Sequence, residues 1–315
     1  MAVSRIDKVA YSVAGFGDTL THDLAYGVPS ALNFFPAQKW QDVAAKIDGR
    51  SYPRADIADV LEENLRKLTG TGSQQQGCQW HTPEAVLKNI ALLREPTTYV
   101  VATGQQAGLL GGPLFSLHKA LSAIKLAQQL EAESGGRARF VPLFWVAGDD
   151  HDLAEIDHVD VLQASGELAR VRARVRPDSA GCSACDAFID PATLDSLKQE
   201  LSQLPPNGEK PAELLEIYRE CDFSEAFTRL LLKWLGPLGL VPAQSHLLRR
   251  FGSELLLREL DDYDVTTRLI QEAAVALQRA RYEPGFSGSA RVAPHFFISS
   301  EPGRIRANLD PVEGE

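Results

Sequence analysis

The sequence predicts an α/β protein whose core is a parallel β-sheet. Two short runs rich in β-branched and apolar residues, 98–103 and 140–147, have the length and composition of buried strands. Between them, helical spacing of apolar residues runs from Leu114 to about Glu133 and ends at two glycines. A strand, a helix and a second strand in this order form a βαβ unit, which almost always has parallel strands. Such a unit places both strand ends at one edge of a sheet, where open α/β sheets bind ligands.

The same rules predict the remaining elements. Amphipathic spacing indicates further helices, over residues 56–68, 83–93, 223–235, 247–260 and 265–281. Short apolar runs indicate further strands, at 159–163 and 168–176 as a hairpin across Ser165-Gly166, and near 239–243 and 292–299.

The spacing of these elements also predicts how the chain is organised. An apparent insertion of roughly 60 residues interrupts the alternation of strands and helices, which is too long for an ordinary connection. We therefore expect core sequence at 1–160 and 222–262, an inserted connecting segment at 161–221, and the start of a second insertion at 263–315.

Composition limits the classes of function open to the chain. Its 315 residues carry 32 Lys and Arg against 42 Asp and Glu, a net charge of −10, whereas a binder of phosphate backbones needs a basic face. No apolar run reaches the ~18–20 residues of a membrane span. Residues 1–11 lack the apolar stretch of a secretory signal. We therefore expect a soluble cytoplasmic protein whose partners include neither nucleic acid nor a membrane.

A glycine-rich segment from Gly104 to Pro113 leads from the first predicted strand into the helix. A helix start offers unpaired N–H groups and the positive end of the helix dipole, and glycines let a carboxylate or phosphate approach the backbone. The spacing matches neither the dinucleotide fingerprint nor a Walker motif, so a tight turn without a ligand is the alternative. The bulky amides of Gln105 and Gln106 favour a binding site, because a turn needs only small residues there.

Three polar residues follow in the first turns of this helix. Ser116 and Lys119 are three positions apart and share a helix face, and Lys119 would neutralise a bound phosphate or carboxylate as a point charge. The alternatives are a solvated lysine and, for His118, a packed histidine.

The strongest local signal is Asp149-Asp150-His151-Asp152, directly after the second strand. A neighbouring carboxylate can orient an imidazole and raise its basicity for proton transfer, and carboxylates also suit Mg²⁺. A loop that only caps the next helix, through Asp150 or Asp152, would need one aspartate and not three. His158 either joins this cluster or lies on the surface.

Two other motifs are interpreted as structural. Cys182 and Cys185 form a C-x-x-C pair, but a zinc site needs two further ligands and the other two cysteines are isolated in the sequence. The strand-to-helix context of a redox motif is also absent. The basic pair Arg249-Arg250 is typical of a solvated helix face.

Two motifs, separated by one predicted helix, are specific when taken together. Residues 103–109 read Thr-Gly-Gln-Gln-Ala-Gly-Leu and are followed by Gly-Pro-Leu at 112–114 and by Lys119. Residues 144–152 read Phe-Trp-Val-Ala-Gly-Asp-Asp-His-Asp, with Glu155 and Ile156 after them. In this order the motifs resemble the BshC family of bacillithiol biosynthesis, and weaker similarity at 223–224 and 239–241 extends the resemblance over most of the chain.

The resemblance implies a Rossmann-like core with helical connecting insertions, related to nucleotidyltransferases. It implies a ligase-type enzyme that joins cysteine to glucosaminyl-malate through an amide bond, with these two small molecules as its substrates. ATP and Mg²⁺ are the candidate cosubstrate and cofactor, and no residue is assigned as a metal ligand. The alternatives are a binding protein that keeps the pocket without turnover and a nucleotidyltransferase with another substrate.

The resemblance also implies an active site where the two motifs converge. The expected catalytic residues are His151, Asp150, Asp152 and Lys119, and the expected substrate-binding residues are Gln105, Gln106, Gly104, Gly112, Ser116 and Asp149. In this hypothesis His151, oriented by Asp150 or Asp152, deprotonates an incoming amine. Lys119 and the loop amides hold an anionic group of the substrate.

The chain departs from the family pattern in two ways. Family members commonly have glutamate where this chain has Asp149, which keeps the charge but shortens the side chain by one methylene. Family chains also continue into a C-terminal coiled coil that supports a dimer. We therefore expect a C-terminally shortened form without the coiled coil, which leaves the family's dimer without that support here.

Overall fold

The computed structural model describes residues 19–35, 39–69, 81–150, 152–162, 165–202, 214–219, 221–285, 296–300 and 303–307. The chain divides into two compact units. The larger one is formed by residues 52–253 and 296–307, and it contains the predicted strands of the core.

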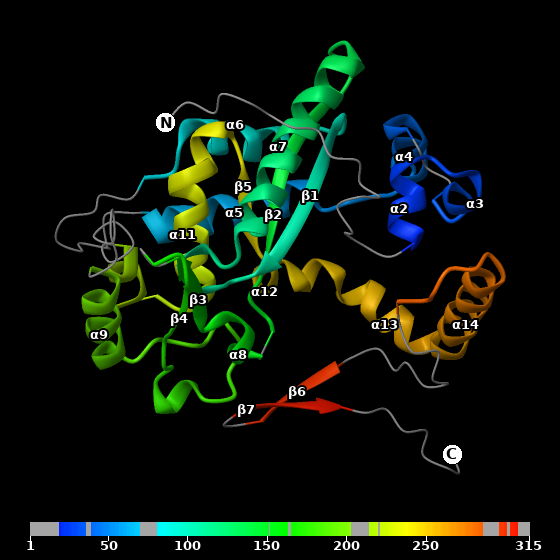
Figure 1. The fold of residues 1–315 in the computed structure, drawn as a ribbon. Coiled ribbons are helices and arrows are strands. Elements are labelled where there is room, and N and C mark those ends of the chain that lie inside the picture. The colour runs from blue at the N-terminus through cyan, green and yellow to red at the C-terminus, as the bar shows by residue number, and fades with distance from the viewer. Residues whose placement is uncertain are drawn as a thin grey trace. The chain divides into compact units, whose positions relative to one another are not determined.

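A three-stranded parallel sheet in the order β1-β2-β5 forms the centre of the larger unit. β1 (Thr98–Gln106) pairs with β2 (Arg139–Ala147), which pairs on its other side with β5 (Val241–Gln244). The helix α7 (Leu114–Ser134) joins β1 to β2 and packs on both strands, as Figure 1 shows. Gly135 ends α7 with φ 61°, a conformation that costs glycine little. These features confirm the predicted βαβ unit and the α/β class.

β1 differs from the prediction in its length and its burial. It continues to Gln106, because residues 104–106 pair in register with residues 145–147 of β2. The loop therefore begins after Gln106 and not at Gly104. β1 also lies at an edge of the described sheet, and Thr98 is its only buried residue, so the prediction of a buried strand was wrong. An edge strand has a partner on one side only, and its apolar run does not reveal this.

α7 buries a different stripe from the one its leucines predict. Ala120 and Ala127 are buried, whereas Leu121 and Leu126 are 43% and 45% exposed. The buried face is the one that packs on β1 and β2, and helical periodicity alone does not separate it from the adjoining face.

The other predicted helices of this unit are present with small changes at their ends. They are α5 (Arg54–Thr69), α6 (Glu84–Leu92) and α11 (Phe223–Leu235). The hairpin is confirmed as the antiparallel pair β3 (His158–Leu162) and β4 (Leu168–Arg172). Between β4 and α11 the described residues form η2 (Pro177–Ser179), α9 (Pro191–Ser202) and η3 (Leu215–Arg219).

The single helix predicted over residues 247–260 was wrong. The chain instead forms α12 (Ser245–Leu248), the 3₁₀ segment η5 (Arg249–Gly252) and α13 (Ser253–Asp261). Gly252, which has low helix propensity, lies where the 3₁₀ segment ends. Arg249, the first residue of the 3₁₀ segment, follows the end of β5 by only a few residues.

The smaller unit is helical in the part that the structure describes, with α2 (Thr19–Ala25), α3 (Pro29–Leu32), α4 (Trp40–Ile47), nearly all of α13 and α14 (Tyr263–Arg279). The predicted strand at 292–299 is β6 (Phe296–Ser300), which pairs with β7 (Gly303–Ala307) and is assigned to the larger unit; residues 292–295 lie outside the described ranges. Among the described helices, none has both the length and the apolar content to cross a bilayer.

Alternation along β2 divides the core into two apolar clusters. Phe144 and Val146 belong to the cluster that includes most buried residues of α11, and Val141 and Leu143 belong to the cluster with α5 and α6. Side chains two apart on a strand share one face of the sheet. Both faces of β2 are therefore covered, which fixes the position of its carboxyl end. Residues 149–152, called the acidic segment below, follow shortly after this end.

Candidate functional site

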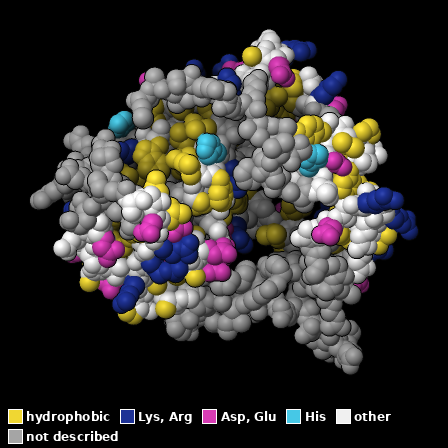
Figure 2. Space-filling model, in the orientation of Figure 1, with side chains coloured by type: hydrophobic (Ala, Val, Ile, Leu, Met, Phe, Trp, Pro, Cys, Tyr) yellow, Lys and Arg dark blue, Asp and Glu magenta, His cyan; other side chains and the backbone are white. Residues whose placement is uncertain are grey.

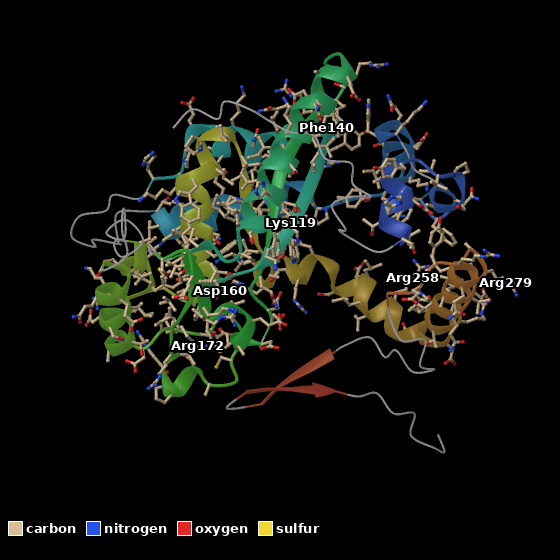
Figure 3. All side chains as sticks on the ribbon, viewed as in Figure 1. Lys119, Phe140, Asp160, Arg172, Arg258 and Arg279 are labelled. Atoms are coloured by element: carbon tan, nitrogen blue, oxygen red, sulfur yellow. The ribbon has the colours of Figure 1, made fainter. Side chains whose placement is uncertain are left out.

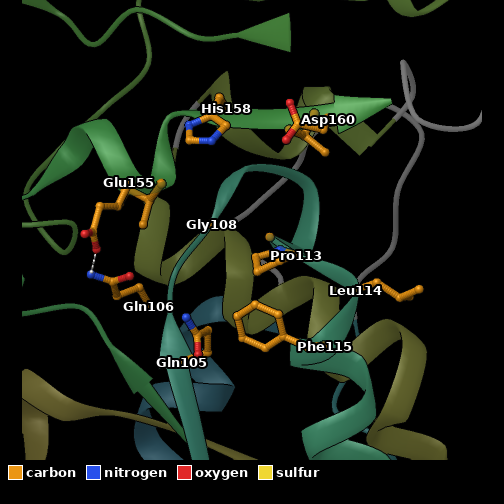
Figure 4. Close-up of a pocket in the computed structure, with 12 residues that line it drawn as sticks. Gln105, Gln106, Gly108, Pro113, Leu114, Phe115, Glu155, His158 and Asp160 are labelled. Atoms are coloured by element: carbon orange, nitrogen blue, oxygen red, sulfur yellow. Dashed lines mark hydrogen bonds between the residues drawn. The ribbon is translucent and has the colours of Figure 1, made fainter. Parts of the chain in front are cut away.

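The carboxyl ends of β1 and β2 bring the two sequence motifs into direct contact. Gln106 is level with Ala147 in the parallel register, so the glycine loop and the acidic segment leave the sheet at the same edge. The side-chain nitrogen of Gln106 donates to Asp150 Oδ2 at 2.5 Å and to Glu155 Oε2 at 2.7 Å. Figure 4 shows the second of these bonds. One amide thus bridges two carboxylates from the neighbouring strand's segment.

Asp150 is held by hydrogen bonds through both carboxylate oxygens. Oδ2 accepts from Gln106, and Oδ1 accepts from the backbone N–H of Asp152 at 3.1 Å. Asp152 is the N-cap residue of α8 (Leu153–Ile156), but its side chain makes no capping hydrogen bond. The residue is exposed to solvent. The predicted base, His151, lies outside the described residues.

Lys119 reaches back from α7 to the end of β1. Its ammonium donates to Gln105 Oε1 at 2.9 Å and to the carbonyl oxygen of Gly104 at 3.3 Å. It also lies 5.1 Å from the centre of the Phe115 ring, within the range of a cation–π contact. Figure 3 labels Lys119 among the side chains of the larger unit. Because the oxygen of the Gln105 amide accepts from Lys119, its nitrogen is the group that this amide offers as a donor.

A groove of about 460 Å³ lies beside these residues, a volume in the range of small-molecule sites. One wall comes from residues 105–115, which include the glycine loop and the start of α7, and the other comes from residues 155–160 of α8 and β3. Figure 4 shows Gln105 and Phe115 on the first wall and His158 on the second. Of the predicted substrate-binding residues, Gln105, Gln106 and Gly112 line this groove.

The other predicted substrate-binding residues, Gly104, Ser116 and Asp149, are not among the residues that line the groove. Ser116 is 1% exposed, and its hydroxyl has no hydrogen-bond partner among the described residues. It lies beneath Gly112, whose φ is 67° and on which an added Cβ would lie 3.7 Å from this hydroxyl. A ligand in the groove therefore does not touch Ser116 in this conformation.

The groove wall formed by β3 carries charge. Asp160 receives two hydrogen bonds from the Arg170 guanidinium, at 2.8 and 2.9 Å, and these bonds hold the pKa of its carboxyl below the usual value. His158 also lines the groove, with its Nδ1 3.2 Å from an Asp157 oxygen. Figure 2 shows acidic and basic side chains side by side over the region of this hairpin.

Arg249, whose sequence context is typical of a solvated helix face, lies at the edge of the sheet where the acidic segment begins. Its Nε is 3.0 Å from Asp149 Oδ2, and the two side chains are 56% and 11% exposed. β5 lies next to β2, so the residues after both strands meet at one edge. Strand order is not encoded in local sequence, and the only signal for Arg249 was its position shortly after a predicted strand.

Buried polar residues that were not predicted from the sequence to be functional contact the start of the acidic segment. The backbone N–H of Gly148 donates to Ser245 Oγ at 3.1 Å, and Gln244 Nε2 donates to Ser224 Oγ at 3.2 Å. A Cβ on Gly148 would lie 2.7 Å from Ser224 Oγ. Glycine is therefore needed at this position for a close approach, and the Ser224 position belongs to the weaker family motif.

The C-x-x-C pair lies in a loop that binds the same segment through its backbone. Ala184 N donates to the carbonyl oxygen of Asp150 and Cys185 N donates to that of Gly148, both at 2.9 Å. Burial raises the pKa of the Cys185 thiol to about 11, so this thiol is protonated and a weak nucleophile near neutral pH. The structural interpretation of the motif agrees with these contacts.

The acidic residues do not form a metal-binding group in the part of the chain that the structure describes. No three His, Cys, Asp or Glu side chains there are placed to hold one ion. The Gln106 amide already occupies an oxygen of Asp150 and an oxygen of Glu155. The described residues therefore provide no protein-only cage for an ion, and no step of the proposed chemistry is routed through Mg²⁺.

A parallel sheet with a polar groove at the carboxyl ends of its strands defines a Rossmann-like protein with a small-molecule site. Residues 5–313 match the model of the family described as "Bacillithiol biosynthesis BshC, N-terminal Rossmann-like domain". The chain belongs to this family, which confirms both the resemblance and the Rossmann-like fold.

Curated relatives support the same assignment. Proteins named "Putative cysteine ligase BshC" are 33% identical over 70% of this chain in Symbiobacterium thermophilum and 31% identical over 76% in Geobacillus kaustophilus. The relative from Koribacter versatilis is 31% identical over 93% of this chain. The chain spans 37%, 43% and 56% of the length of these three proteins.

Proposed function

We propose that this protein joins cysteine to glucosaminyl-malate through an amide bond, as the ligase of bacillithiol biosynthesis. The observation that carries the proposal is the contact of Gln106 with Asp150 and Glu155 beside the groove. It brings the two family motifs to one site, and the relatives' name supplies the class of reaction.

The two walls of the groove suit the two kinds of group on glucosaminyl-malate. Gln105 offers an amide N–H, and the first turn of α7 offers backbone N–H groups and the positive end of the helix dipole. These groups favour the malate carboxylates. On the opposite wall, Glu155 favours the substrate's amine and hydroxyls with the lone pairs that its bond to Gln106 leaves open, whereas Asp160 is already paired with Arg170. Lys119 adds positive charge to the first wall through its contact with Gln105.

The chemistry requires a neutral amine and an activated carboxyl group. The amine nitrogen forms a bond to the carboxyl carbon of cysteine, loses a proton, and the carboxyl group loses an oxygen-bearing leaving group. ATP, the candidate cosubstrate, would supply the activation that creates this leaving group; the N–H groups at the start of α7 suit a phosphate as well as a carboxylate.

We assign the role of base to His151. Because both oxygens of Asp150 are engaged with Gln106 and the Asp152 backbone, Asp150 serves to hold the segment. Asp152, whose side chain makes no capping bond, is the carboxylate proposed to orient the imidazole.

The test is to incubate the purified protein with glucosaminyl-malate, cysteine and ATP and to detect the thiol product by mass spectrometry, with ATP and Mg²⁺ omitted in turn. His151→Ala should lower the rate by about 10²-fold or more, as expected for loss of a general base, and Lys119→Ala should also lower it. Melting temperatures should stay near that of the wild type.

The matched control is His118→Ala, one position before Lys119, exposed and outside the groove lining. It should leave the rate unchanged. No product from folded protein would overturn the proposal, and ligand binding without product would favour the binding-protein alternative. Equal losses of rate and stability would make His151 and Lys119 structural residues.

A further inference from the structure

We infer that described residues between β4 and α11 hold the glycine loop and the backbone after β2 in register, and that the buried hydroxyl of Tyr218 is the positioning group for the glycine loop. Tyr218 would act through the loop without touching the substrate. The inference rests on the proposed function for the identity of the ligand, but the contact itself can be tested without any ligand.

The contact joins Tyr218 to the most constrained residue of the loop. Tyr218, in η3, is 0% exposed, and its hydroxyl accepts a hydrogen bond from Leu110 N at 2.8 Å. Leu110 has φ 52°, a left-handed conformation that a leucine avoids for steric reasons. Apart from glycines, Arg281 is the one other described residue with a positive φ. Such a conformation persists where the surrounding structure holds it.

The position of Leu110 determines the shape of one groove wall. Gly108 and Gly112, two residues to either side, line the groove. An added Cβ on Gly108 would lie 2.6 Å from Gly112 Cα, so the loop closes tightly on itself. Gly111 lies against the Trp234 ring, which an added Cβ would approach to 2.7 Å. The loop is therefore supported on its buried side by Tyr218 and Trp234, and a change in Leu110 would move the groove wall.

The same segment also holds the other half of the site. Its Ala184 and Cys185 amides donate to the carbonyls of Asp150 and Gly148. Ala184 and Tyr218 belong to one buried apolar cluster, which fixes the two contact points relative to each other. One connecting segment thus binds the backbone after β1 and the backbone after β2.

The ring and the hydroxyl of Tyr218 have separable roles. The ring packs in the core, with its centre 5.8 Å from that of Phe223 in an edge-to-face arrangement. A phenylalanine would keep this packing and remove only the oxygen that receives the Leu110 N–H. Burial raises the pKa of the phenol above its usual value, so the group is neutral near pH 7.

The experiment compares Tyr218→Phe with Tyr282→Phe. Tyr282 is the matched control because it is 4% exposed and its hydroxyl bonds to Ser30 and Asp23 in the other unit. The first readout is hydrogen exchange at the Leu110 amide, which should become about tenfold faster in Tyr218→Phe if one hydrogen bond is lost. It should be unchanged in Tyr282→Phe.

The second readout is the dissociation constant for glucosaminyl-malate by calorimetry, which should rise about tenfold in Tyr218→Phe and stay constant in the control. Leu110→Gly, which removes the steric penalty of the left-handed conformation, provides the rescue. In that background Tyr218→Phe should weaken binding by less than roughly threefold, because the loop no longer needs the hydroxyl to hold it.

Unchanged exchange at Leu110 would overturn the inference, as would equal loss of affinity in both Tyr→Phe variants or a full tenfold loss in the Leu110→Gly background. If the wild-type protein binds no glucosaminyl-malate but exchange responds as expected, the proposed substrate is wrong and the contact between Tyr218 and the loop stands.

Discussion

Gln106 organises the site because its amide carries two N–H groups that point to two different carboxylates. A single nitrogen donates to Asp150 and Glu155 together. Two carboxylates that close to each other repel unless a donor lies between them. The amide is such a donor and adds no net charge.

Replacing this amide by a carboxylate should reverse its effect. Gln106→Glu would place a third negative charge beside Asp150 and Glu155, and we expect the free energy of unfolding at pH 7 to fall by about 1–2 kcal/mol. The loss should shrink as the pH is lowered towards 4, because the crowded carboxyls then bind protons. Urea unfolding at several pH values measures this. Gln106→Leu removes the donor without adding a charge, so it should show a smaller recovery at low pH; equal recovery in both variants would contradict a role for the added charge.

Asp222 caps a helix with its side chain although that side chain is buried. It caps α11 by accepting from Glu225 N at 2.8 Å, yet it is only 7% exposed. Burial raises the pKa of its carboxyl to about 8, and the capping hydrogen bond opposes this shift only in part. The folded protein therefore keeps a proton on Asp222 at pH values where the unfolded chain has lost it.

The difference in proton binding at Asp222 between the folded and unfolded states predicts how the free energy of unfolding depends on pH. Between about pH 4 and 8 the folded state binds more protons than the unfolded state at this residue, so stability falls as the pH rises, by up to about 1.4 kcal/mol per pH unit. Asn also caps helices well, so Asp222→Asn should remove this slope and make the protein relatively more stable at pH 8. Denaturant titrations from pH 5 to 8 test it, with the exposed Asp264→Asn as the control. An identical slope in wild type and Asp222→Asn would show that Asp222 is ionised when folded.

At the scale of elements, the end of β2 is fixed by how closely it approaches α11. Gly148 follows the strand directly, and its N–H bonds to Ser245 at the start of α12. A Cβ added to Gly148 would lie only 2.7 Å from Oγ of Ser224 in α11, so Ser224 already fills this space. The acidic segment can begin at this point only because residue 148 has no side chain.

A methyl group at this position should therefore displace one of the two elements. We expect Gly148→Ala to lower the free energy of unfolding by about 1–3 kcal/mol, as overpacked buried sites do, and to reduce ligand binding by shifting Asp150. Ser224→Ala in the same chain should restore part of the stability because it removes the nearest atom. Thermal and urea unfolding provide the measurement. Gly252→Ala, with no atom within 4 Å of the added Cβ, is the neutral control, and equal losses in both alanine variants would argue against a steric cause.

The elements show which parts of the sequence-based prediction succeed and why. The hairpin, α7 and α11 were predicted because each is determined by its own periodicity and by the glycines or aspartates at its ends. The length of β1 and the break after α12 were not, because strand pairing and contacts with distant residues determine them. Strand pairing also explains an error at the site. Residues 104–106 were predicted to be functional but were assigned to a loop, whereas they pair with β2 as the end of β1.

At the scale of the whole molecule, the charge balance makes ligand binding local. The chain carries a net charge of −10, so an anionic substrate is not attracted by the protein's overall field. Binding must rest on short-range donors such as Gln105 and the start of α7, with Lys119 as a cation paired to that amide.

Such binding should appear as stabilisation of the folded protein. At about one hundred times its dissociation constant, glucosaminyl-malate should add about 2.7 kcal/mol to the free energy of unfolding. Lys119→Ala should reduce this gain at the same ligand concentration, whereas Lys125→Ala, exposed on α7 and outside the groove lining, should preserve it. Thermal denaturation with and without ligand measures the shift. A gain that is equal in wild type and Lys119→Ala would exclude Lys119 from the binding site.

The sequence by itself determined the βαβ unit, the α/β class, the family, and the two motifs that follow neighbouring strands, because these depend on residues close together in the chain. Only the tertiary structure decided that Arg249 meets Asp149, that the buried Ser224 fits against Gly148, and that Tyr218 binds the backbone of the glycine loop. Each of these contacts joins residues about 75 to 110 positions apart, and their pairing depends on strand order and on packing across the sheet. Local patterns of hydrophobicity carry neither.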